Sequence, residues 1–329
     1  MRLAVIGATG HVGGYLVPRL VRAGHEVVAL SRGEQRPYHD DSAWSEVGRR
    51  RIDRATAEAE GTFASQIADL DADAVIDMIC FTPASAASLV EALRGRTGHL
   101  VVCSSIWAAG WLREVPGRED DASEPWGEYG IGKRRVEELL AAESARDGGL
   151  RTTALRPGHI SGPGWPVITP QGNLDGTVWE RLASGGDVLR PGFGLETLNH
   201  VHADDVAQAF ELALRPEYRG SGERFTVVAE RAATARGLAQ QAAEGFGRDA
   251  VLRFASWDEF AASLDPADAE ASREHLSRSQ AMSSERARAA LGYAPRYRPI
   301  DAVAEAVNRL AELGRLDLGG HRLDAERVA

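Results

Sequence analysis

A glycine-rich segment near the N-terminus constrains the fold more than any other feature of this chain. Gly7, Gly10 and Gly13 directly follow a short apolar run, Arg2–Ile6, and open an amphipathic stretch. Glycines at this spacing permit a tight turn, close approach of the backbone to a pyrophosphate, and close packing of a helix on a strand. The N-terminus of the following helix offers unpaired N–H groups to phosphate oxygens. The segment predicts a dinucleotide site that contains Gly7, Thr9, Gly10, His11, Val12 and Gly13.

The first half of the chain alternates short apolar runs with helix-length amphipathic segments. The expected buried strands are Arg2–Ile6, Glu26–Leu30, Ala74–Cys80, Leu100–Cys103 and Thr152–Leu155. The expected helices between them include Val12–Ala23, Ser85–Leu93 and Lys133–Ala145. Repeated β-α-β units predict an α/β fold with a doubly wound parallel sheet of the Rossmann type. Ligands of such sheets bind outside the carboxyl ends of the strands.

The pattern changes after about Pro163, where glycine, proline and tryptophan interrupt the chain and strand-like runs become scarce. One further run, Arg224–Ala229, would add an edge strand to the sheet, and the rest is mainly helical. We expect a dinucleotide-binding domain at 1–164, to which 198–230 returns, and a smaller substrate-binding lobe from 165–197 and 231–318. The polar tail 319–329 is expected to fray.

Charge and composition exclude some classes of binding partner. The formal net charge is −10, and an acidic surface repels phosphate backbones, so we expect no nucleic-acid partner. No apolar stretch approaches the roughly 20 residues that span a bilayer, so no membrane partner is expected. The apolar run before Gly7 is also shorter than the roughly 7–15 residues of a secretory signal, which predicts a cytoplasmic protein.

Cys80 and Cys103 are the only cysteines, and both lie in apolar runs. They are expected to be buried thiols rather than a disulfide or metal site. No cluster of His, Cys, Asp and Glu has the spacing of metal ligands, so no metal is predicted.

Cofactor choice is predicted from the end of the second apolar run, where Ser31 and Arg32 follow Leu30. A carboxylate at this point would accept hydrogen bonds from a ribose 2′-hydroxyl and select NAD. None is present, whereas Arg32 would pair with a 2′-phosphate and Ser31 would donate to it. NADP is therefore predicted, with NAD as the alternative.

Three residues form the candidate catalytic group. Tyr129 and Lys133 are four residues apart at the start of a helix, which puts phenol and ammonium on one face. A nearby cation favours the phenolate over the phenol, whose unperturbed pKa is about 10. Ser105 follows the run Leu100–Cys103 and would emerge at the same sheet edge as the glycine loop. Its hydroxyl would hold a substrate oxygen while Tyr129 exchanges the proton.

At these residues the chain resembles the extended short-chain dehydrogenase/reductase family, also called the NAD-dependent epimerase/dehydratase family. The resemblance covers roughly residues 1–312 and includes six motifs in the family's order. They are the glycine loop, the pair Ser104 and Ser105, Tyr129 with Lys133, Arg156 and Pro157 followed by 162–164, His202 with Asp204 and Asp205, and 291–295.

The resemblance implies a role for each matching residue. Ser105, Tyr129 and Lys133 would be the catalytic triad, with Lys133 also holding the nicotinamide ribose, and Asp53 would be the acidic residue after the third strand that contacts adenine. Further residues expected at the cofactor are Met78, Ile79, Cys80, Ser104, Pro157, His159 and Ile160.

Two departures from the family pattern concern the substrate. His159 stands where nucleotide-sugar members usually carry asparagine, and Leu198 stands where they carry an arginine that grips the diphosphate. Arg181 or Arg190 would be the substitutes for that arginine. Several tryptophans fall in segments that line the family's cleft, and their rings suit aromatic or hydrophobic ligands. The substrate residues predicted from these observations are Trp107, His159, Trp165, Trp179 and Leu198, with Trp111 and Trp126 nearby and His11 as a surface residue beside the cofactor.

The favoured function is that of an oxidoreductase moving hydride between nicotinamide C4 and a carbonyl or carbinol carbon, most simply a ketoreductase on a small metabolite. A nucleotide-sugar epimerase, which oxidises transiently without net redox change, would share the same site. A non-catalytic dinucleotide sensor or RNA-associated protein is the rival class. By analogy with the family, a homodimer would form through Ser85–Leu93 and Val136–Leu140.

Overall fold

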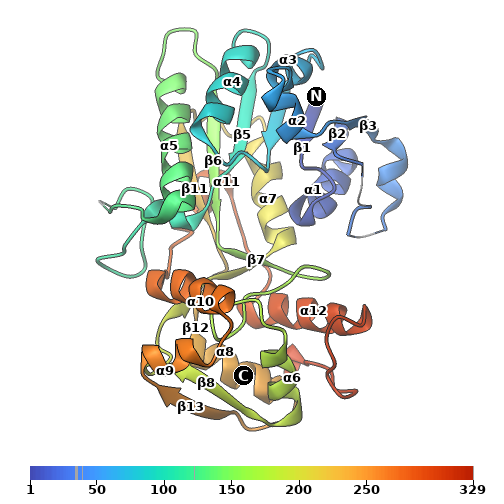
Figure 1. The fold of residues 1–329 in the computed structure, drawn as a ribbon. Helices are drawn as coiled ribbons and strands as arrows, with labels where there is room; N and C mark the ends of the chain where they lie inside the picture. Colours follow the sequence, from blue (N-terminus) through green and yellow to red (C-terminus); the bar gives the residue numbers. More distant parts are fainter. Residues whose placement is uncertain (34–35, 39, 122, 329) are drawn as a thin grey trace.

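Seven parallel strands form the central sheet of the computed structural model, in the order β11-β6-β5-β4-β1-β2-β3 (Figure 1). The structure describes residues 1–33, 36–38, 40–121 and 123–328. The strands are β1 (Arg2–Ile6), β2 (Glu26–Ser31), β3 (Gly48–Arg51), β4 (Ala74–Asp77), β5 (His99–Cys103), β6 (Thr152–Pro157) and β11 (Glu223–Val227). The parallel sheet confirms the predicted fold class.

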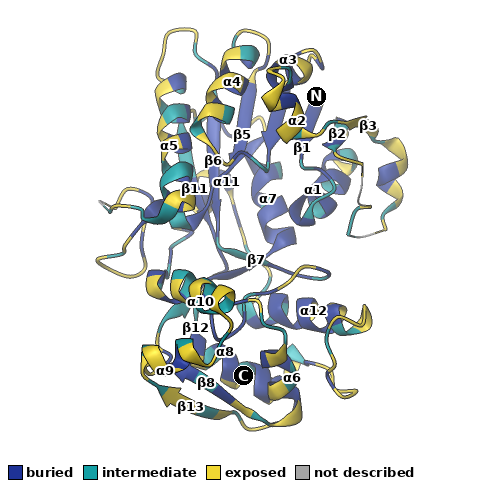
Figure 2. Ribbon diagram, viewed as in Figure 1, coloured by how far each residue is buried: buried dark blue, intermediate teal, exposed yellow. Residues whose placement is uncertain are grey.

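Helices cover both faces of this sheet. Because side chains of a strand alternate between faces, Leu3 and Val5 of β1 join one hydrophobic cluster, while Ala4 and Ile6 join another. The first cluster includes residues of α1 (His11–Arg22), α7 (Ala203–Ala213) and α11 (Glu285–Leu291). The second includes residues of α2 (Arg54–Ala59), α3 (Phe63–Ala68), α4 (Pro83–Leu93) and α5 (Gly127–Ser144). Burial on both faces explains why the central strands are continuous apolar runs (Figure 2).

A second lobe lies beyond the carboxyl ends of the strands, below the sheet in Figure 1. Its own hydrophobic cluster is centred on Trp179, Leu238 and Val303. Its helices are α6 (Thr177–Ser184), α8 (Ala235–Gly245), α9 (Trp257–Ala262), α10 (Pro266–Arg278) and α12 (Pro299–Glu312). Three small sheets accompany them: β8 (Asp187–Pro191) with β13 (Val251–Ala255), β9 (Thr197–Leu198) with β12 (Ala233–Thr234), and β7 (His159–Ser161) with β10 (His200–His202). Single 3-10 turns are η1 (Ser42–Glu46), η2 (Ile106–Ala109) and η3 (Ala325–Arg327).

The strands differ from the predicted ranges mainly at their ends. β4 stops at Asp77 rather than Cys80, and β6 continues to Pro157 because its last residues pair with β11. β11 forms the expected edge strand. β3 lies just before Asp53, where the resemblance implies a third strand, but no apolar pattern marks its bounds because its four residues, from Gly48 to Arg51, are all exposed. The domain boundaries proposed from the sequence stay a prediction.

The polar tail is not frayed where the structure describes it. Leu323 and Val328 are buried in the cluster of the second lobe. Asn308 exchanges hydrogen bonds with the backbone of Leu323, and Arg298 Nη1 donates to the Val328 carbonyl. Two apolar side chains and these bonds anchor a segment that composition alone marks as mobile.

The two helices proposed to form a homodimer interface bury apolar side chains inside the chain's own core. Leu89 and Val90 of α4, with Val136 and Leu140 of α5, are buried in the cluster beneath the sheet. An outward-facing apolar surface is therefore not formed by these residues, and the homodimer stays a prediction. In the part of the chain that the structure describes, no helix has both the length and the apolar character needed to cross a membrane.

Candidate active site

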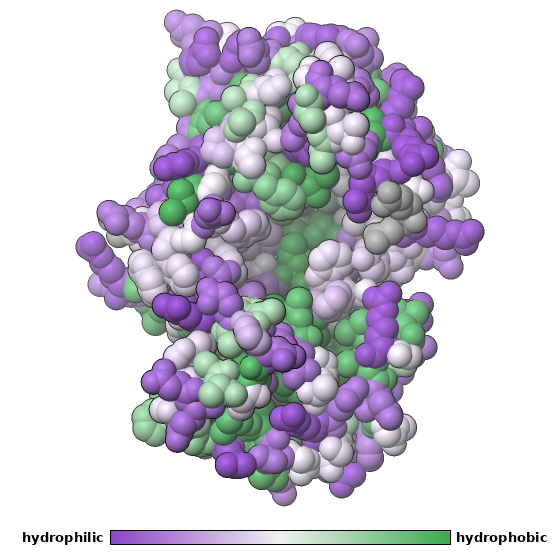
Figure 3. Space-filling model, in the orientation of Figure 1, coloured by the Kyte–Doolittle hydropathy of each residue, from purple (hydrophilic) through white to green (hydrophobic). Residues whose placement is uncertain are grey.

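A cavity of about 640 Å³ lies where the carboxyl ends of the strands meet the second lobe. Figure 3 shows this hollow between the two halves, with hydrophobic residues along it. Its lining combines the glycine loop, the catalytic candidates and residues of the second lobe. The lining residues are Gly7, Gly10, His11, Val12, Met78, Ile79, Phe81, Cys103, Ser104, Ser105, Ile106, Trp107, Tyr129, Lys133, Pro157, Gly158, His159, Ile160, Trp165, Pro166, Ile168, Leu174, Glu274 and His275.

The glycine loop has the shape that a dinucleotide pyrophosphate requires. Gly7 has a φ of +83°, in the left-handed region that favours glycine. A Cβ on Gly13 would lie 2.2 Å from the Ala8 carbonyl oxygen, so only glycine fits there. Gly10 caps α1 without a side-chain hydrogen bond, and the first turn of α1 holds no acidic residue. The N-terminus of α1 is therefore open to an anion. Thr9 lies half-buried in the same loop.

His11 is buried, which corrects the prediction of a surface residue. Trp165 stacks on its ring, with centroids 5.5 Å apart and planes 7° apart. Tyr38 contacts both rings from the side, at centroid distances of 5.5 Å and 5.9 Å. Aromatic side chains from three separate segments thus pack together beside the glycine loop, and two of them, His11 and Trp165, line the cavity.

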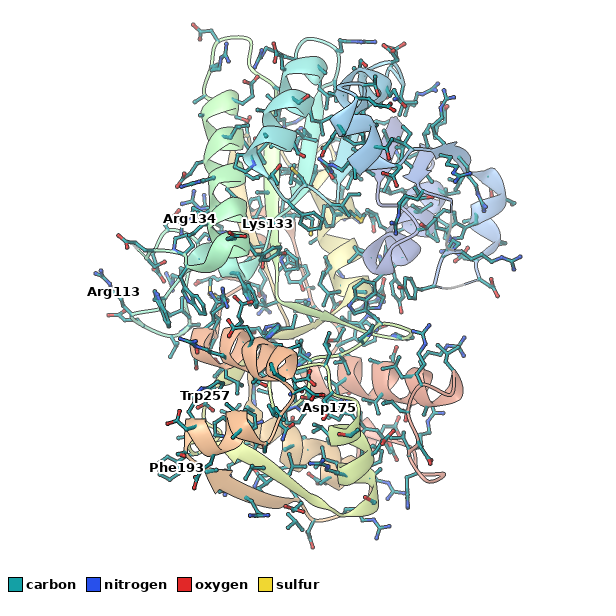
Figure 4. All side chains as sticks on the ribbon, in the orientation of Figure 1. Arg113, Lys133, Arg134, Asp175, Phe193 and Trp257 are labelled. Carbon is teal, nitrogen blue, oxygen red and sulfur yellow. The ribbon has the colours of Figure 1, made fainter. Side chains whose placement is uncertain are left out.

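Ser105, Tyr129 and Lys133 come together at the cavity, as the spacing predicts. Ser105 follows β5, and its Oγ accepts a hydrogen bond from the Trp107 backbone N–H at 3.2 Å. Tyr129 and Lys133 lie in the first two turns of α5, at the end of the helix that faces the second lobe (Figure 4). Lys133 is buried, and its Nζ donates to the carbonyl oxygens of Cys80 and Cys103 at 2.8 and 2.7 Å. One of the three ammonium protons remains for a group in the cavity.

The pKa of Tyr129 departs from the direction expected from Lys133. Burial and, to a smaller extent, the neighbouring Cys103 thiol raise this pKa to about 12, and the side-chain hydrogen bond with Ser105 opposes the rise. The Lys133 ammonium is turned to two carbonyl oxygens and lies 5.6 Å from the centre of the Tyr129 ring. The expected phenolate-favouring effect of Lys133 is therefore absent from this state, and Tyr129 is a protonated acid at neutral pH.

A buried ion pair fixes α5 against the sheet directly behind the triad. Arg156 of β6 donates from Nε to Glu137 Oε1 at 2.8 Å, and its Nη2 contacts Oε2. The Ser104 hydroxyl donates a hydrogen bond to the same carboxylate. Ser104, a predicted cofactor residue, lines the cavity, but its hydroxyl proton is bonded to Glu137. Sequence reasoning misses Glu137. Its position four residues after Lys133, on the same helix face, is the signal that would have found it.

The predicted adenosine-end residues lie outside this cavity. Ser31 ends β2 and its Oγ accepts from the Gly33 N–H at 3.3 Å, while Arg32 is exposed beside it. Asp53 caps α2 by accepting from the Thr56 N–H at 3.0 Å. That backbone hydrogen bond lowers the pKa of Asp53, and the Arg32 cation adds a smaller effect. The carboxylate therefore lies close enough to Arg32 to share one site with it.

The segment after β4 contributes in two ways. Met78 and Ile79 line the cavity. Cys80 does not; it is buried, and burial raises the pKa of its thiol to about 12. Its contribution is the carbonyl oxygen that accepts from Lys133. Pro157 and Ile160, from the segment after β6, reach the cavity as expected.

The predicted substrate residues divide into two groups. Trp107, His159 and Trp165 line the cavity. The prediction for Trp179 and Leu198 is wrong, because both are packed in the core of the second lobe, at 1% and 0% exposure. Neither Arg181 nor Arg190 reaches the cavity. Within the described residues, Lys133 is the only lysine or arginine that lines it.

Histidines form one part of the wall opposite the triad. The His159 ring lies 5.7 Å from His200 and 5.3 Å from His275, measured between centroids. Burial, together with His275, His200 and Arg278, holds the pKa of His159 well below its usual range, so the ring is neutral. Both of its nitrogens are buried without a hydrogen-bond partner among the described residues.

Several cavity residues carry no sequence signal. Phe81 follows β4, Ile168 and Leu174 lie between β7 and α6, and Glu274 and His275 come from α10. They are far apart in sequence, belong to no motif, and meet only when the second lobe folds over the strand ends. Among the side chains that the structure describes, no group of three or more His, Cys, Asp and Glu is arranged to hold a metal.

The glycine loop at the strand ends and the Ser, Tyr and Lys group define a nicotinamide-dinucleotide class of protein, and a family comparison agrees. The model of the NAD dependent epimerase/dehydratase family matches residues 3–228, more than half of the chain. The chain belongs to this family. The resemblance stated from the motifs is thereby confirmed.

Two curated relatives are similar in sequence. The chain is 34% identical over 223 residues to 2'-dehydrokanamycin reductase of Streptomyces kanamyceticus, covering 67% of this chain and 60% of that protein. It is 26% identical over 254 residues to the chloroplast stem-loop binding protein of 41 kDa b of Arabidopsis thaliana, covering 75% of this chain and 63% of that protein. The chain thus spans less than two thirds of the length of either relative.

A solved structure shares the fold over nearly the whole chain. The UDP-glucuronic acid 4-epimerase of Bacillus cereus, in complex with UDP-glucuronic acid and NAD, superimposes with a TM-score of 0.71 at 17% identity. The match covers 95% of this chain and 100% of that one. At this identity the likeness bears on the fold alone.

Proposed function

We propose that this protein is an NADP-preferring ketoreductase that reduces the carbonyl group of a small, neutral or weakly charged metabolite. The observation that carries the proposal is the meeting of Ser105, Tyr129 and Lys133 at one cavity beside an open helix N-terminus. The Streptomyces relative is named a reductase, which supports reduction as the direction.

The residues present fit a nicotinamide dinucleotide. The loop around Gly7, Gly10 and Gly13 would receive the pyrophosphate, and Lys133 would donate its remaining N–H to the nicotinamide ribose. Pro157 and Ile160 would pack on the nicotinamide, and Asp53 would serve the adenine end. When bound, the reduced nicotinamide supplies the hydride. Localisation in the cytoplasm accords with this use of the cellular NADPH pool and is part of the proposal.

The chain's own residues would handle the substrate oxygen and its proton. Ser105 Oγ accepts the Trp107 N–H, and its own proton, which lies toward the Tyr129 oxygen in this structure, would be donated to the substrate carbonyl oxygen that enters beside them. Tyr129, with a pKa of about 12, holds its proton at neutral pH and can transfer it to the stronger base, an alkoxide. Lys133 is itself held beside them by hydrogen bonds to the backbone carbonyls of Cys80 and Cys103.

The proposed preference for NADP over NAD rests on Arg32, which follows β2. A guanidinium there provides a bidentate partner for a 2′-phosphate. Asp53 lies at the edge of this region and is exposed, so it leaves room for both groups. The matched family is named for NAD, and the Bacillus epimerase was solved with NAD, so NAD remains the alternative cofactor.

The cavity favours a substrate without a diphosphate. Leu198 occupies the core rather than the cavity, and Lys133 is the one cavity-lining lysine or arginine in the described part of the chain. The walls are largely apolar and aromatic, with Phe81, Trp107 and Trp165 among them. Such a cavity suits a carbonyl compound that is held mainly by apolar and aromatic contacts.

Two other functions have supporting observations. A nucleotide-sugar epimerase is supported by the Bacillus structure, which holds UDP-glucuronic acid in the same fold. For an RNA-associated role, the supporting observation is that the Arabidopsis relative is named a stem-loop binding protein. Tyr129 and Lys133 remain in place here and the net charge is −10, and both facts favour an enzyme on a small molecule.

Steady-state NADPH oxidation with a panel of ketones tests the proposal. A ketoreductase consumes one NADPH for each alcohol formed. An epimerase converts its substrate with no net consumption, and a sensor binds NADPH without turnover of any compound. Binding of NADPH without oxidation across the panel, together with tight RNA binding, would overturn the proposal.

A further inference from the structure

A layered stack of one guanidinium and three indoles runs from the surface to the cavity wall. The Arg278 guanidinium carbon lies 3.6 Å from the centre of the Trp107 ring and 3.8 Å from that of Trp126. Trp111 stacks on Trp126 with centroids 5.2 Å apart and planes 15° apart. Trp111 is half exposed, whereas Trp107 lines the cavity. Arg278 therefore joins the second lobe to the loops beside the triad.

The nitrogen atoms of the Arg278 guanidinium also have partners. Nη1 donates to the Glu274 carbonyl at 2.6 Å and Nη2 donates to the Trp126 carbonyl at 3.1 Å. Arg278 is 4% exposed. Burial lowers the pKa of Arg278 to about 10, so it remains charged at neutral pH. A guanidinium covered and bonded in this way is committed to the protein and not to a ligand.

Both indoles belong to segments that carry catalytic candidates. The Trp107 backbone N–H donates to Ser105 Oγ, and the Trp107 ring meets the Tyr129 ring edge-on, at 5.6 Å and 86°. Trp126 is the residue that caps α5, three positions before Tyr129. Arg278 touches neither Ser105 nor Tyr129, but it holds the segment beside each of them.

The same arginine also fixes the wall opposite the triad. It is the last residue of α10, and the preceding turn supplies Glu274 and His275 to the cavity. The His275 ring contacts Trp107 with centroids 5.0 Å apart. Displacing Arg278 would therefore move the substrate wall and the Ser105 loop relative to each other.

We propose that Arg278 is a positioning residue that sets the distance between Ser105, Tyr129 and the substrate wall by clamping Trp107 and Trp126. The inference rests on the proposed function, because it assigns Arg278 to the same triad. Arginine suits the task, since its planar cation stacks on both indoles while its edge bonds two carbonyls. Misplacement of reacting groups by about 1 Å can lower a rate by about a hundredfold.

Kinetics of three arginine variants test this role. R278M keeps the length of the side chain but removes the cation, R278K keeps the cation without the plane, and R273M is a control on the exposed face of the same helix. We expect R278M to lower kcat by about ten- to a hundredfold while KM for the ketone and the NADPH affinity change by less than about threefold. R278K should recover part of kcat, and R273M should equal the wild type.

The outcomes separate the two proposals. A wild-type enzyme that turns over no ketone and epimerises no sugar defeats the proposed function and this inference with it. A wild-type enzyme with turnover beside an R278M variant that keeps more than half of kcat, or that changes only KM, defeats the positioning role alone. If R278M does not fold, as judged by circular dichroism, W126L takes its place with the same expectation for kcat, because it removes one face of the clamp.

Discussion

Arg156 in strand β6 of the central sheet and Arg190 in the second lobe are both completely buried, yet their surroundings differ. Arg156 bonds the Glu137 carboxylate through Nε and Nη2, and Glu137 also accepts from Ser104. None of the three guanidinium nitrogens of Arg190 has a hydrogen-bond partner among the described residues, and Glu196 lies 4.0 Å away. Burial lowers the pKa of Arg190 to about 10.

The same contrast extends to other buried polar groups. Lys133, on the sheet side, has two carbonyl partners. Several side-chain atoms on the other side have none within the described chain, among them both His159 nitrogens, Thr197 Oγ1, Asn199 Oδ1 and Glu196 Oε2. An unmade bond of this kind costs about 1–3 kcal/mol. The sheet half also contains such atoms, among them Trp44 Nε1 and Thr226 Oγ1, so the contrast applies to the buried groups around the triad and not to every residue of that half.

The catalytic candidates lie in the sheet half of the molecule. The largest loss of activity is therefore expected when Tyr129, the proposed proton donor, is replaced. Y129F removes the proton donor and should lower kcat by about 10²–10⁴-fold, the range for a general acid. Cofactor affinity should stay within about twofold, because the phenyl ring remains. The measurement is steady-state NADPH oxidation beside a fluorescence titration of NADPH, with Y297F as the control for loss of a phenol elsewhere. Retention of more than a tenth of wild-type kcat would show that another group is the acid.

The buried pairs themselves give the next largest effect. R156M leaves the Glu137 carboxylate buried without its guanidinium and should destabilise the fold by about 3–5 kcal/mol. Urea denaturation measures this loss, and R309M, which breaks an exposed pair with Glu312, should cost less than about 1 kcal/mol. A loss for R156M as small as that for R309M would mean that the pair beneath the sheet is not a structural anchor.

The preference for NADPH over NADH should also depend on residues of the sheet half, and in particular on Arg32. R32D exchanges the proposed 2′-phosphate partner for a carboxylate and should reverse a preference for NADPH of at least about tenfold, equivalent to about 1.4 kcal/mol. Calorimetric titration of NADPH and NADH against both proteins checks the reversal. Equal affinities of the unaltered protein for the two cofactors would remove Arg32 from the account.

The smallest effect is expected at Arg190. R190M removes a buried charge that has no hydrogen bond within the described structure and only a long ion pair, at 4.0 Å, with Glu196, so the loss in the free energy of unfolding should be smaller than for R156M. The comparison with R156M, measured under the same conditions, sharpens the contrast between the halves. A loss for R190M that equals the loss for R156M would show that Arg190 is paired as firmly as Arg156.

Most of the sheet half could be predicted because local patterns encode it. The apolar run Arg2–Ile6 before the glycine loop forms a strand buried on both faces, and the spacing of Tyr129 and Lys133 fixes their shared helix face. The bounds of β3 could not be predicted from the apolar pattern, because an exposed edge strand of glycine and arginines needs no apolar residues. The direction of the Tyr129 pKa could not be predicted either, because it depends on burial and on the carbonyl partners of Lys133.

The second lobe is harder to predict because its contribution to the site is made by distant contacts. Alignment to a motif places Trp179 and Leu198 in the cleft, but helix packing puts them in the core. Glu274 and His275 reach the cavity from a helix more than 100 residues beyond Tyr129, with no motif to mark them. Which face of such a helix meets the cavity is decided by tertiary packing and not by periodicity.

Transfer of deuterium from NADPH labelled at nicotinamide C4 tests the central claim most directly. The enzyme is incubated with the labelled cofactor and a ketone that it consumes, and the product is examined by mass spectrometry. We predict an alcohol that carries one deuterium at the carbinol carbon, formed in equal amount to the NADP⁺ released, and no labelled product from Y129F. Product formed without release of NADP⁺ would contradict this mechanism and show an epimerase instead.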